Sequence, residues 1–168
     1  MYRIAVCDDN RALLEAAAER LRIYFEREEI VLSLFETGES LLNSVREKDC
    51  LCQLAILDIE LGEMNGIEVG DELNRLLPDC QIIYLTGYLD YAPEVYSTRY
   101  TYYVYKPTME KHLPLALEKA VAALEELIHG RLVLPQKGEQ LVLEKQTILY
   151  MERRLRTTII HTTNGKMT

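Results

Sequence analysis

Four side chains with complementary chemistry stand where apolar runs of the sequence end. Asp58 directly follows one apolar run, the pair Asp8 and Asp9 follows another, and Lys106 ends a third. In an open α/β sheet, residues just past the carboxyl ends of parallel strands converge on one crevice. Three carboxylates would then share a pocket with one ammonium. Carboxylates this crowded need a proton or a divalent cation, and oxygen ligands alone favour Mg²⁺.

The elements that must position these side chains are five apolar runs that alternate with amphipathic segments. The third and fourth runs are almost continuously apolar, which is typical of central parallel strands covered on both faces. Asn10 and Glu39/Ser40 stand where helices are expected to begin. We therefore predict an α/β domain over residues 1–129, a doubly wound five-stranded parallel sheet. Its strands are expected at residues 2–7, 30–35, 53–58, 81–86 and 101–106.

Residues 130–168 have a different pattern, that of short consecutive strands. Apolar triplets flank a turn signal at Lys137-Gly138, which predicts a hairpin. Further strands are expected at 148–152 and 157–162, and Asn164-Gly165 favours a type I′ hairpin turn. We expect this segment to be a partial all-β unit, with the chain stopping inside its last hairpin.

Composition limits the class of protein. No apolar run approaches the roughly 20 residues of a membrane span, and the strand pattern at Met1 leaves no room for a signal peptide. The four cysteines lie in or near apolar runs, so we expect small buried hydrophobes in a reducing cytoplasm. Cys50-Leu51-Cys52 lacks a second pair at zinc spacing. The three histidines have no ligand spacing and are expected at the surface.

Charge is divided unevenly along the chain. Residues 1–130 carry 12 Lys/Arg and 24 Asp/Glu, a balance of −12, whereas residues 131–168 carry 7 and 3, a balance of +4; together they give the overall −8. An acidic body with a basic tail suggests two functions in one chain. The tail's charge is a modest footprint for nucleic acid.

Phosphoryl transfer onto a carboxylate is the chemistry that these groups favour. Asp58 would be the nucleophile and form an acyl phosphate. Asp8 and Asp9 would hold Mg²⁺, while Lys106 and the Thr86 hydroxyl would bind phosphoryl oxygens. Such transfer depends mainly on positioning and electrostatic stabilisation, so few residues suffice.

In these motifs, residues 2–128 resemble the receiver domain of two-component response regulators. The resemblance implies a flavodoxin-like, CheY-like fold. It makes Asp58 the phosphoacceptor that becomes 4-aspartylphosphate, Asp9 a direct metal ligand and Asp8 an indirect one. The backbone carbonyl of Glu60 would be the third protein ligand to Mg²⁺.

The same resemblance assigns a switch. Thr86 corresponds to the family's switch hydroxyl, Tyr103 to its switch aromatic, and Lys106-Pro107 to its phosphoryl-binding pair. The chain departs from the family pattern at Gly62, where proline is usual, and at Tyr100, where a small residue is common. Pro93 interrupts the segment 88–98, so a helix there is expected to be short or displaced.

The tail resembles the start of a LytTR output domain, the DNA-binding module of LytR/AgrA-type regulators. The residues that carry this likeness are 148–152, 156–162 and Asn164-Gly165. That module has roughly a hundred residues in the family, so the fragment 130–168 would hold its first third. The DNA-contacting residues stay unknown, because the family's base-contacting loops lie largely beyond Thr168.

We therefore predict a cytoplasmic response regulator rather than an enzyme. Its partners would be a sensor histidine kinase and, for the intact protein, DNA, with no membrane association. A homodimer would form through the tyrosine-rich 88–128 face or the tail strands. Two alternatives stay open: a haloacid-dehalogenase-like Mg²⁺-dependent phosphatase, and a receiver-fold interaction domain that is not phosphorylated. The former needs a second Asp two residues after the nucleophile, where Glu60 stands.

Overall fold

The computed structural model describes residues 1–62, 64–87, 98–136, 139–155 and 157–167. The chain divides into two compact units, Met1–Ala122 and Ala123–Thr168. Within the described residues, no helix is both long and apolar enough to cross a membrane.

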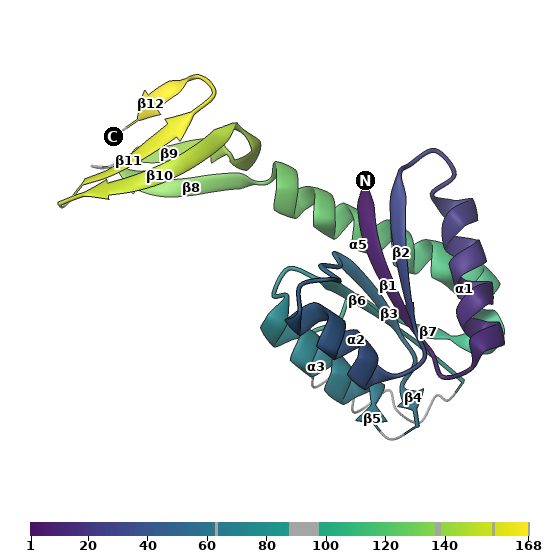
Figure 1. Ribbon diagram of the computed structural model, residues 1–168. Helices are drawn as coiled ribbons and strands as arrows, with labels where there is room; N and C mark the ends of the chain where they lie inside the picture. The colour runs from purple at the N-terminus through teal and green to yellow at the C-terminus, as the bar shows by residue number, and fades with distance from the viewer. Residues whose placement is uncertain (63, 88–97, 137–138, 156, 168) are drawn as a thin grey trace. The chain divides into compact units, whose positions relative to one another are not determined.

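A five-stranded parallel sheet forms the centre of the first unit (Figure 1). The strand order is β2-β1-β3-β6-β7, and all four strand pairs are parallel. This confirms the predicted fold class, with strand ends within one residue of expectation. The strands are β1 (Tyr2–Cys7), β2 (Ile30–Phe35), β3 (Leu54–Leu57), β6 (Gln81–Thr86) and β7 (Tyr102–Tyr105).

Helices cover both faces of this sheet, as a doubly wound fold requires (Figure 1). Buried side chains of α1 and α5 pack on one face, and those of α2 and α3 pack on the other. Each face therefore has its own apolar core, and β3 is buried throughout. The helices are α1 (Arg11–Tyr24), α2 (Gly38–Arg46), α3 (Gly66–Leu76) and α5 (Met109–His129), the last preceded by a 3₁₀ turn, η1 (Lys106–Thr108).

Side-chain caps begin the first two helices. The Asn10 side chain accepts hydrogen bonds from the backbone N–H groups of Ala12 and Leu13, as predicted. The expected start of α2 at Glu39/Ser40 was wrong, because Thr37 is the N-cap. Its Oγ1 accepts a hydrogen bond from the Ser40 N–H at 3.2 Å, so the helix begins at Gly38, one or two residues earlier than expected.

The tyrosine-rich segment is only partly described. Tyr84 is fully buried in the core and cannot be part of a partner surface. Tyr100 and Tyr103 are partly buried and pack against the core on the α2 and α3 face. Pro93 and the tyrosines at 88, 91 and 96 lie outside the described residues, so the interface predicted across them stays a prediction.

After the last turns of α5, the second unit consists of antiparallel strands, as expected. A hairpin of β8 (Arg131–Gln136) and β9 (Glu139–Glu144) is followed by a 3₁₀ turn, η2 (Lys145–Thr147), and a three-stranded sheet in the order β10-β11-β12. The sheet's strands are β10 (Ile148–Arg154), β11 (Thr157–Thr162) and β12 (Gly165–Met167).

Two local expectations for the second unit were wrong. A type I′ turn requires a positive φ at both Asn164 and Gly165. Of these two residues, only Gly165 has one, at 125°. The loop residues are Thr163 and Asn164, and the Thr162 hydroxyl closes the loop by donating to the Gly165 carbonyl. His161 is buried rather than at the surface, with its Nε2 3.0 Å from a Glu152 carboxylate oxygen.

Candidate metal centre

The carboxyl edge of the parallel sheet gathers the predicted acidic side chains. Asp8 and Asp9 follow β1, and Asp58 follows β3, which pairs directly with β1. One carboxylate oxygen from each of the three lies within 4.8 Å of the others. Asp8 and Asp58 are buried, whereas Asp9 is exposed. The crevice predicted from the sequence is therefore present, and it opens to solvent on the Asp9 side.

Lys106 is the cation of this pocket. Its Nζ lies 2.7 Å from Asp8 Oδ2 and 2.6 Å from Asp58 Oδ2. The lysine immediately follows β7 and is the first residue of the 3₁₀ turn η1, in which Pro107 comes second. Its side chain is only 14% exposed, so water screens these two contacts little. One ammonium thus compensates one of the three carboxylate charges.

Burial and neighbouring charges shift the pKa values of Asp58, Lys106 and Cys7. Burial raises the pKa of the Asp58 carboxyl, although Lys106 acts in the opposite direction. Burial also acts to lower the pKa of Lys106, but its hydrogen bonds to Asp58 and Asp8 outweigh this and raise it. Burial, followed by the charges of Asp8, Asp58 and Asp9, raises the pKa of the neighbouring Cys7 thiol to about 12. The pocket therefore has a negative potential that favours a cation.

A divalent cation fits this donor set. Asp58 Oδ1 is buried and has no hydrogen-bond partner within the described part of the chain, although buried polar atoms are usually satisfied. An open cavity of about 590 Å³ adjoins Asp9, and its lining also includes Ile59 and Glu60 from the loop after Asp58. Oxygen donors of this kind, with space for retained water, are what Mg²⁺ requires.

The loop after Asp58 forms the wall of that cavity. Glu60 lies in a short hairpin, β4 (Glu60–Leu61) paired with β5 (Met64–Asn65). Gly62 in its turn has φ of 72°, which proline cannot adopt. The departure from the family pattern at this position therefore has a structural counterpart: the turn takes a path that a proline would forbid.

Gly66, the first residue of α3, allows this helix to begin close to Asp58. Its N–H donates to the Ile59 carbonyl at 2.8 Å. A Cβ at this position would overlap the backbone carbonyl of Asp58. The Asn65 side chain caps the helix by accepting from the Ile67 N–H. Only glycine allows α3 to begin directly beneath the aspartate loop.

The two predicted switch residues lie on neighbouring strands. Thr86 is completely buried at the carboxyl end of β6, next to β3. Tyr103 on β7 lies opposite Tyr84 in the register, two residues before the partner of Thr86. The structure thus places Thr86 at the same edge of the sheet as Asp58. Tyr103 is partly buried on β7, the strand that pairs with the strand of Thr86.

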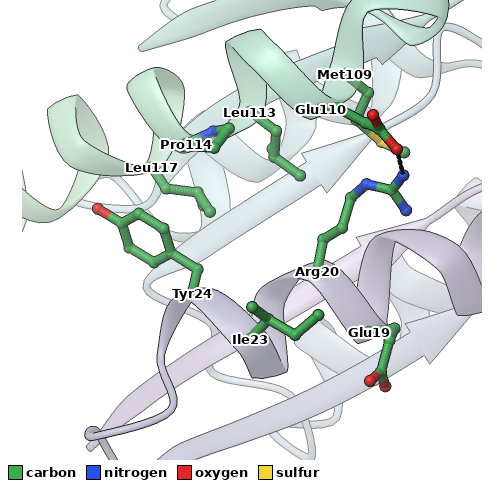
Figure 2. Close-up of a pocket in the computed structure, with 9 residues that line it drawn as sticks. All are labelled: Glu19, Arg20, Ile23, Tyr24, Met109, Glu110, Leu113, Pro114 and Leu117. Carbon is green, nitrogen blue, oxygen red and sulfur yellow. Dashed lines mark hydrogen bonds and ion pairs between the residues drawn. The ribbon is translucent and has the colours of Figure 1, made fainter.

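A second cavity, of about 450 Å³, lies between α1 and α5 and contains none of the predicted site residues (Figure 2). Its walls are largely apolar, with an ion pair of 2.8 Å between Arg20 and Glu110 at one end. It lies on the α1 and α5 face of the sheet and plays no part in the chemistry of the acidic pocket. The lining residues are Glu19, Arg20, Ile23, Tyr24, Met109, Glu110, Leu113, Pro114 and Leu117.

Comparison with known families identifies this combination of fold and acidic pocket. The model of the response regulator receiver domain matches residues 4–118. The chain belongs to this family. The predicted resemblance to response regulators is thereby confirmed, and the matched range includes all the predicted site residues.

Curated relatives extend the likeness beyond the receiver. The chain is 29% identical to the transcriptional regulatory protein NatR of Bacillus subtilis, over 97% of this chain and 69% of NatR. It is 26% identical to the sensory transduction protein LytT of Oceanobacillus iheyensis, over 94% of this chain and 65% of LytT. It is 28% identical to the transcriptional regulatory protein LytR of Staphylococcus aureus, over 78% of this chain and 56% of LytR. The likeness to LytR-type regulators agrees with the predicted type, and the chain spans only part of each relative's length.

Solved structures share the receiver fold. The response regulator TrrA of Thermotoga maritima, solved in complex with Mg²⁺-BeF, has a TM-score of 0.61 and 31% identity, over 71% of this chain and 99% of that one. A receiver domain from Clostridium thermocellum has a TM-score of 0.64 and 22% identity, over 76% and 99%.

Proposed function

We propose that Asp58 is the phosphoacceptor of this receiver and that bound Mg²⁺ supports its phosphorylation. The metal would be held by Asp58, Asp9 and the Glu60 carbonyl, with Asp8 in an indirect role. The observation that carries the proposal is the unpartnered Asp58 Oδ1 beside two further carboxylates. Asp58 Oδ2 is already held by Lys106 at 2.6 Å. One oxygen is therefore oriented while the other can bind the metal, which leaves the carboxylate positioned to attack a phosphoryl group.

Once Asp58 carries a phosphoryl group, three residues would respond to it. Lys106 would pair with one phosphoryl oxygen and the Thr86 hydroxyl with another, and Tyr103 would turn inward as Thr86 moves. Support comes from the buried position of Thr86 at the pocket's edge and from the packing of Tyr103 against the same core. A small local shift can be amplified in this way, because packed cores tend to occupy discrete arrangements.

In the intact protein we propose that this switch controls transcription. The donor would be a sensor histidine kinase in the cytoplasm, and phosphorylation would promote a homodimer through the tyrosine-rich 88–128 face or the tail strands. Residues 1–129 would form the receiver and 130–168 the beginning of a LytTR output domain that binds DNA. The names of NatR and LytR as transcriptional regulatory proteins support this role, as does the all-β character of the tail.

Acetyl phosphate with Mg²⁺ tests the first proposal. The wild-type chain should gain the mass of one phosphoryl group, and Asp58→Asn should gain none. Omitting Mg²⁺ or adding a chelator should abolish the gain in the wild type. Equal labelling of Asp58→Asn would contradict the assignment. Steady turnover of a generic phosphate ester would instead favour the phosphatase alternative, and failure to bind Mg²⁺ would favour an interaction domain.

A further inference from the structure

Residues 98–101, which lead into β7, are held against α3 and β6 by hydrogen bonds. We refer to these residues as the strap. The Asn74 side chain on α3 makes two bonds with Arg99: its Nδ2 donates to the Arg99 carbonyl at 2.9 Å, and its Oδ1 accepts from Arg99 Nε at 3.3 Å. Arg99 Nη2 also donates to the Pro78 carbonyl. One arginine of the strap is thus fixed at three points to α3 and the loop that follows it.

Further contacts join the strap to β6. The Thr101 hydroxyl donates to Gln81 Oε1 at 2.9 Å, and the Thr101 N–H donates to the Ile82 carbonyl at 2.7 Å. The Thr98 hydroxyl lies 3.5 Å from the hydroxyl of Tyr84, which is a long and therefore weak hydrogen bond. The strap is thereby fixed at both of its ends.

Tyr84 is enclosed between α3 and the strap. Its side chain is completely buried on β6, and a Cβ at Gly70 on α3 would overlap its hydroxyl. On the other side, the centroids of the Tyr84 ring and the ring of Tyr100 in the strap are 6.0 Å apart. The Tyr84 ring has no room to move toward α3, so a displacement of this ring would be transmitted to the strap.

The strap is next to the proposed switch. Tyr103 follows the strap by two residues and lies opposite Tyr84 in the register of β6 and β7. Tyr84, Tyr100 and Tyr103 share one core, on the α2 and α3 face of the sheet. Tyr84 also precedes Thr86 by two positions, so alternation along the strand directs both side chains to this face. An inward turn of Tyr103 would therefore add volume next to Tyr84, in a close-packed interior.

We propose that Asn74 is a positioning residue for the switch, because its bonds to Arg99 hold the strap in the arrangement that precedes phosphorylation of Asp58. In this arrangement Lys106 is bonded to the Asp58 carboxylate itself at 2.6 Å. The strap and Lys106 stand at opposite ends of β7, so a shift of Tyr103 between them would strain the hydrogen bonds of the strap. Asn74 would in this way oppose the phosphorylated arrangement. The inference rests on the proposed function of Asp58 and Tyr103.

Removal of the Asn74 side chain should strengthen the binding of a phosphoryl analogue at Asp58. A contact that is stronger in the unmodified arrangement weakens the binding of any ligand that requires the other arrangement, and its removal strengthens that binding by the same factor. The loss of one net hydrogen bond corresponds to a factor of about 2 to 10. Asn74→Ala should therefore bind the analogue about 2- to 10-fold more tightly than the wild type.

Titration of the full chain with beryllofluoride, a mimic of the phosphoryl group, tests the proposal in the presence of Mg²⁺. Fluorine NMR measures the bound fraction. Asn74→Ala and Arg99→Ala should both bind more tightly, and the double variant should gain less than the product of the two separate gains, because the two residues are in contact. Asn43→Ala is the matched control. It removes a similar contact with an arginine, Arg46, at 3.2 Å within α2, and it should bind as the wild type does.

Urea unfolding of each variant separates this role from a structural one, because a merely structural contact changes stability but not the affinity of the folded chain. If Asn74→Ala does not fold, Arg99→Ala, at an exposed position, gives the same test. The inference is overturned, and the proposed function left intact, if the wild type binds beryllofluoride but the folded variant binds it equally or more weakly, or if Asn43→Ala gains as much. A wild type that binds none would contradict the proposed function, and the inference with it.

Discussion

Replacing Lys106 by glutamine should destabilise the protein by about 3–5 kcal/mol, the usual cost of leaving buried charges without their partner. At an effective dielectric constant of about 20, charges 2.6 and 2.7 Å apart attract by about 6 kcal/mol each. Desolvation of the ammonium offsets much of this gross attraction. Removal of the lysine leaves Asp8 and Asp58, both buried, beside a third carboxylate, so repulsion adds to the loss.

Urea unfolding followed by far-ultraviolet circular dichroism, at neutral pH without Mg²⁺, measures this change. Lys111→Gln is the matched control, because Lys111 is exposed on α5, which directly follows the 3₁₀ turn of Lys106, and it should change stability by less than about 0.5 kcal/mol. In an Asp58→Asn background the loss from Lys106→Gln should shrink, since the two residues are in contact. Equal, small losses for Lys106→Gln and Lys111→Gln would refute the electrostatic account of the pocket.

Three further predictions concern the same edge of the sheet. Because the pKa of Asp58 is raised, mainly by burial, protons compete with Mg²⁺ at a higher pH than they would at an ordinary carboxyl. The Mg²⁺ affinity, measured by calorimetry, should therefore fall as the pH drops through this raised pKa. An affinity that does not change until the pH reaches the ordinary aspartate range would contradict this. Gly66→Ala should destabilise the chain by more than about 1 kcal/mol in urea unfolding, because its Cβ would overlap the Asp58 carbonyl, whereas unchanged stability would show that the loop yields. Gly62→Pro should also destabilise the chain by more than about 1 kcal/mol, since proline cannot adopt a φ of 72°. A Gly62→Pro chain as stable as the wild type would mean that the loop can take the backbone path that is usual in the family.

Much of the receiver could be predicted from the sequence because its signals are local. The run 54–57 is buried throughout, and such continuous apolar runs identify central strands without any knowledge of contacts. The acidic pair and Asp58 could be brought together in advance because parallel strands share one carboxyl edge. Asn10 was identified as a helix start for a local reason too, since its side chain caps the residues that follow it.

Two kinds of feature could not be predicted: a helix start where two capping residues compete, and a contact between residues that are distant in the sequence. Thr37 and Ser40 are both good capping residues, and only the structure shows that Thr37 accepts the hydrogen bond that begins α2. The burial of His161 depends on packing against other strands, and a sequence pattern does not show this. The approach of Cys80 to Cys52 follows from the alignment of β3 with β6, which no local motif encodes.

Chemical trapping of the phosphorylated residue tests the central claim most directly. The chain is incubated with acetyl phosphate and Mg²⁺, treated with borohydride to reduce any acyl phosphate, and digested for tandem mass spectrometry. The proposed role of Asp58 predicts homoserine at position 58 in a Mg²⁺-dependent yield, with Asp8 and Asp9 unchanged. Homoserine at either of those positions, or none at position 58 while the chain still gains a phosphoryl group, would contradict it.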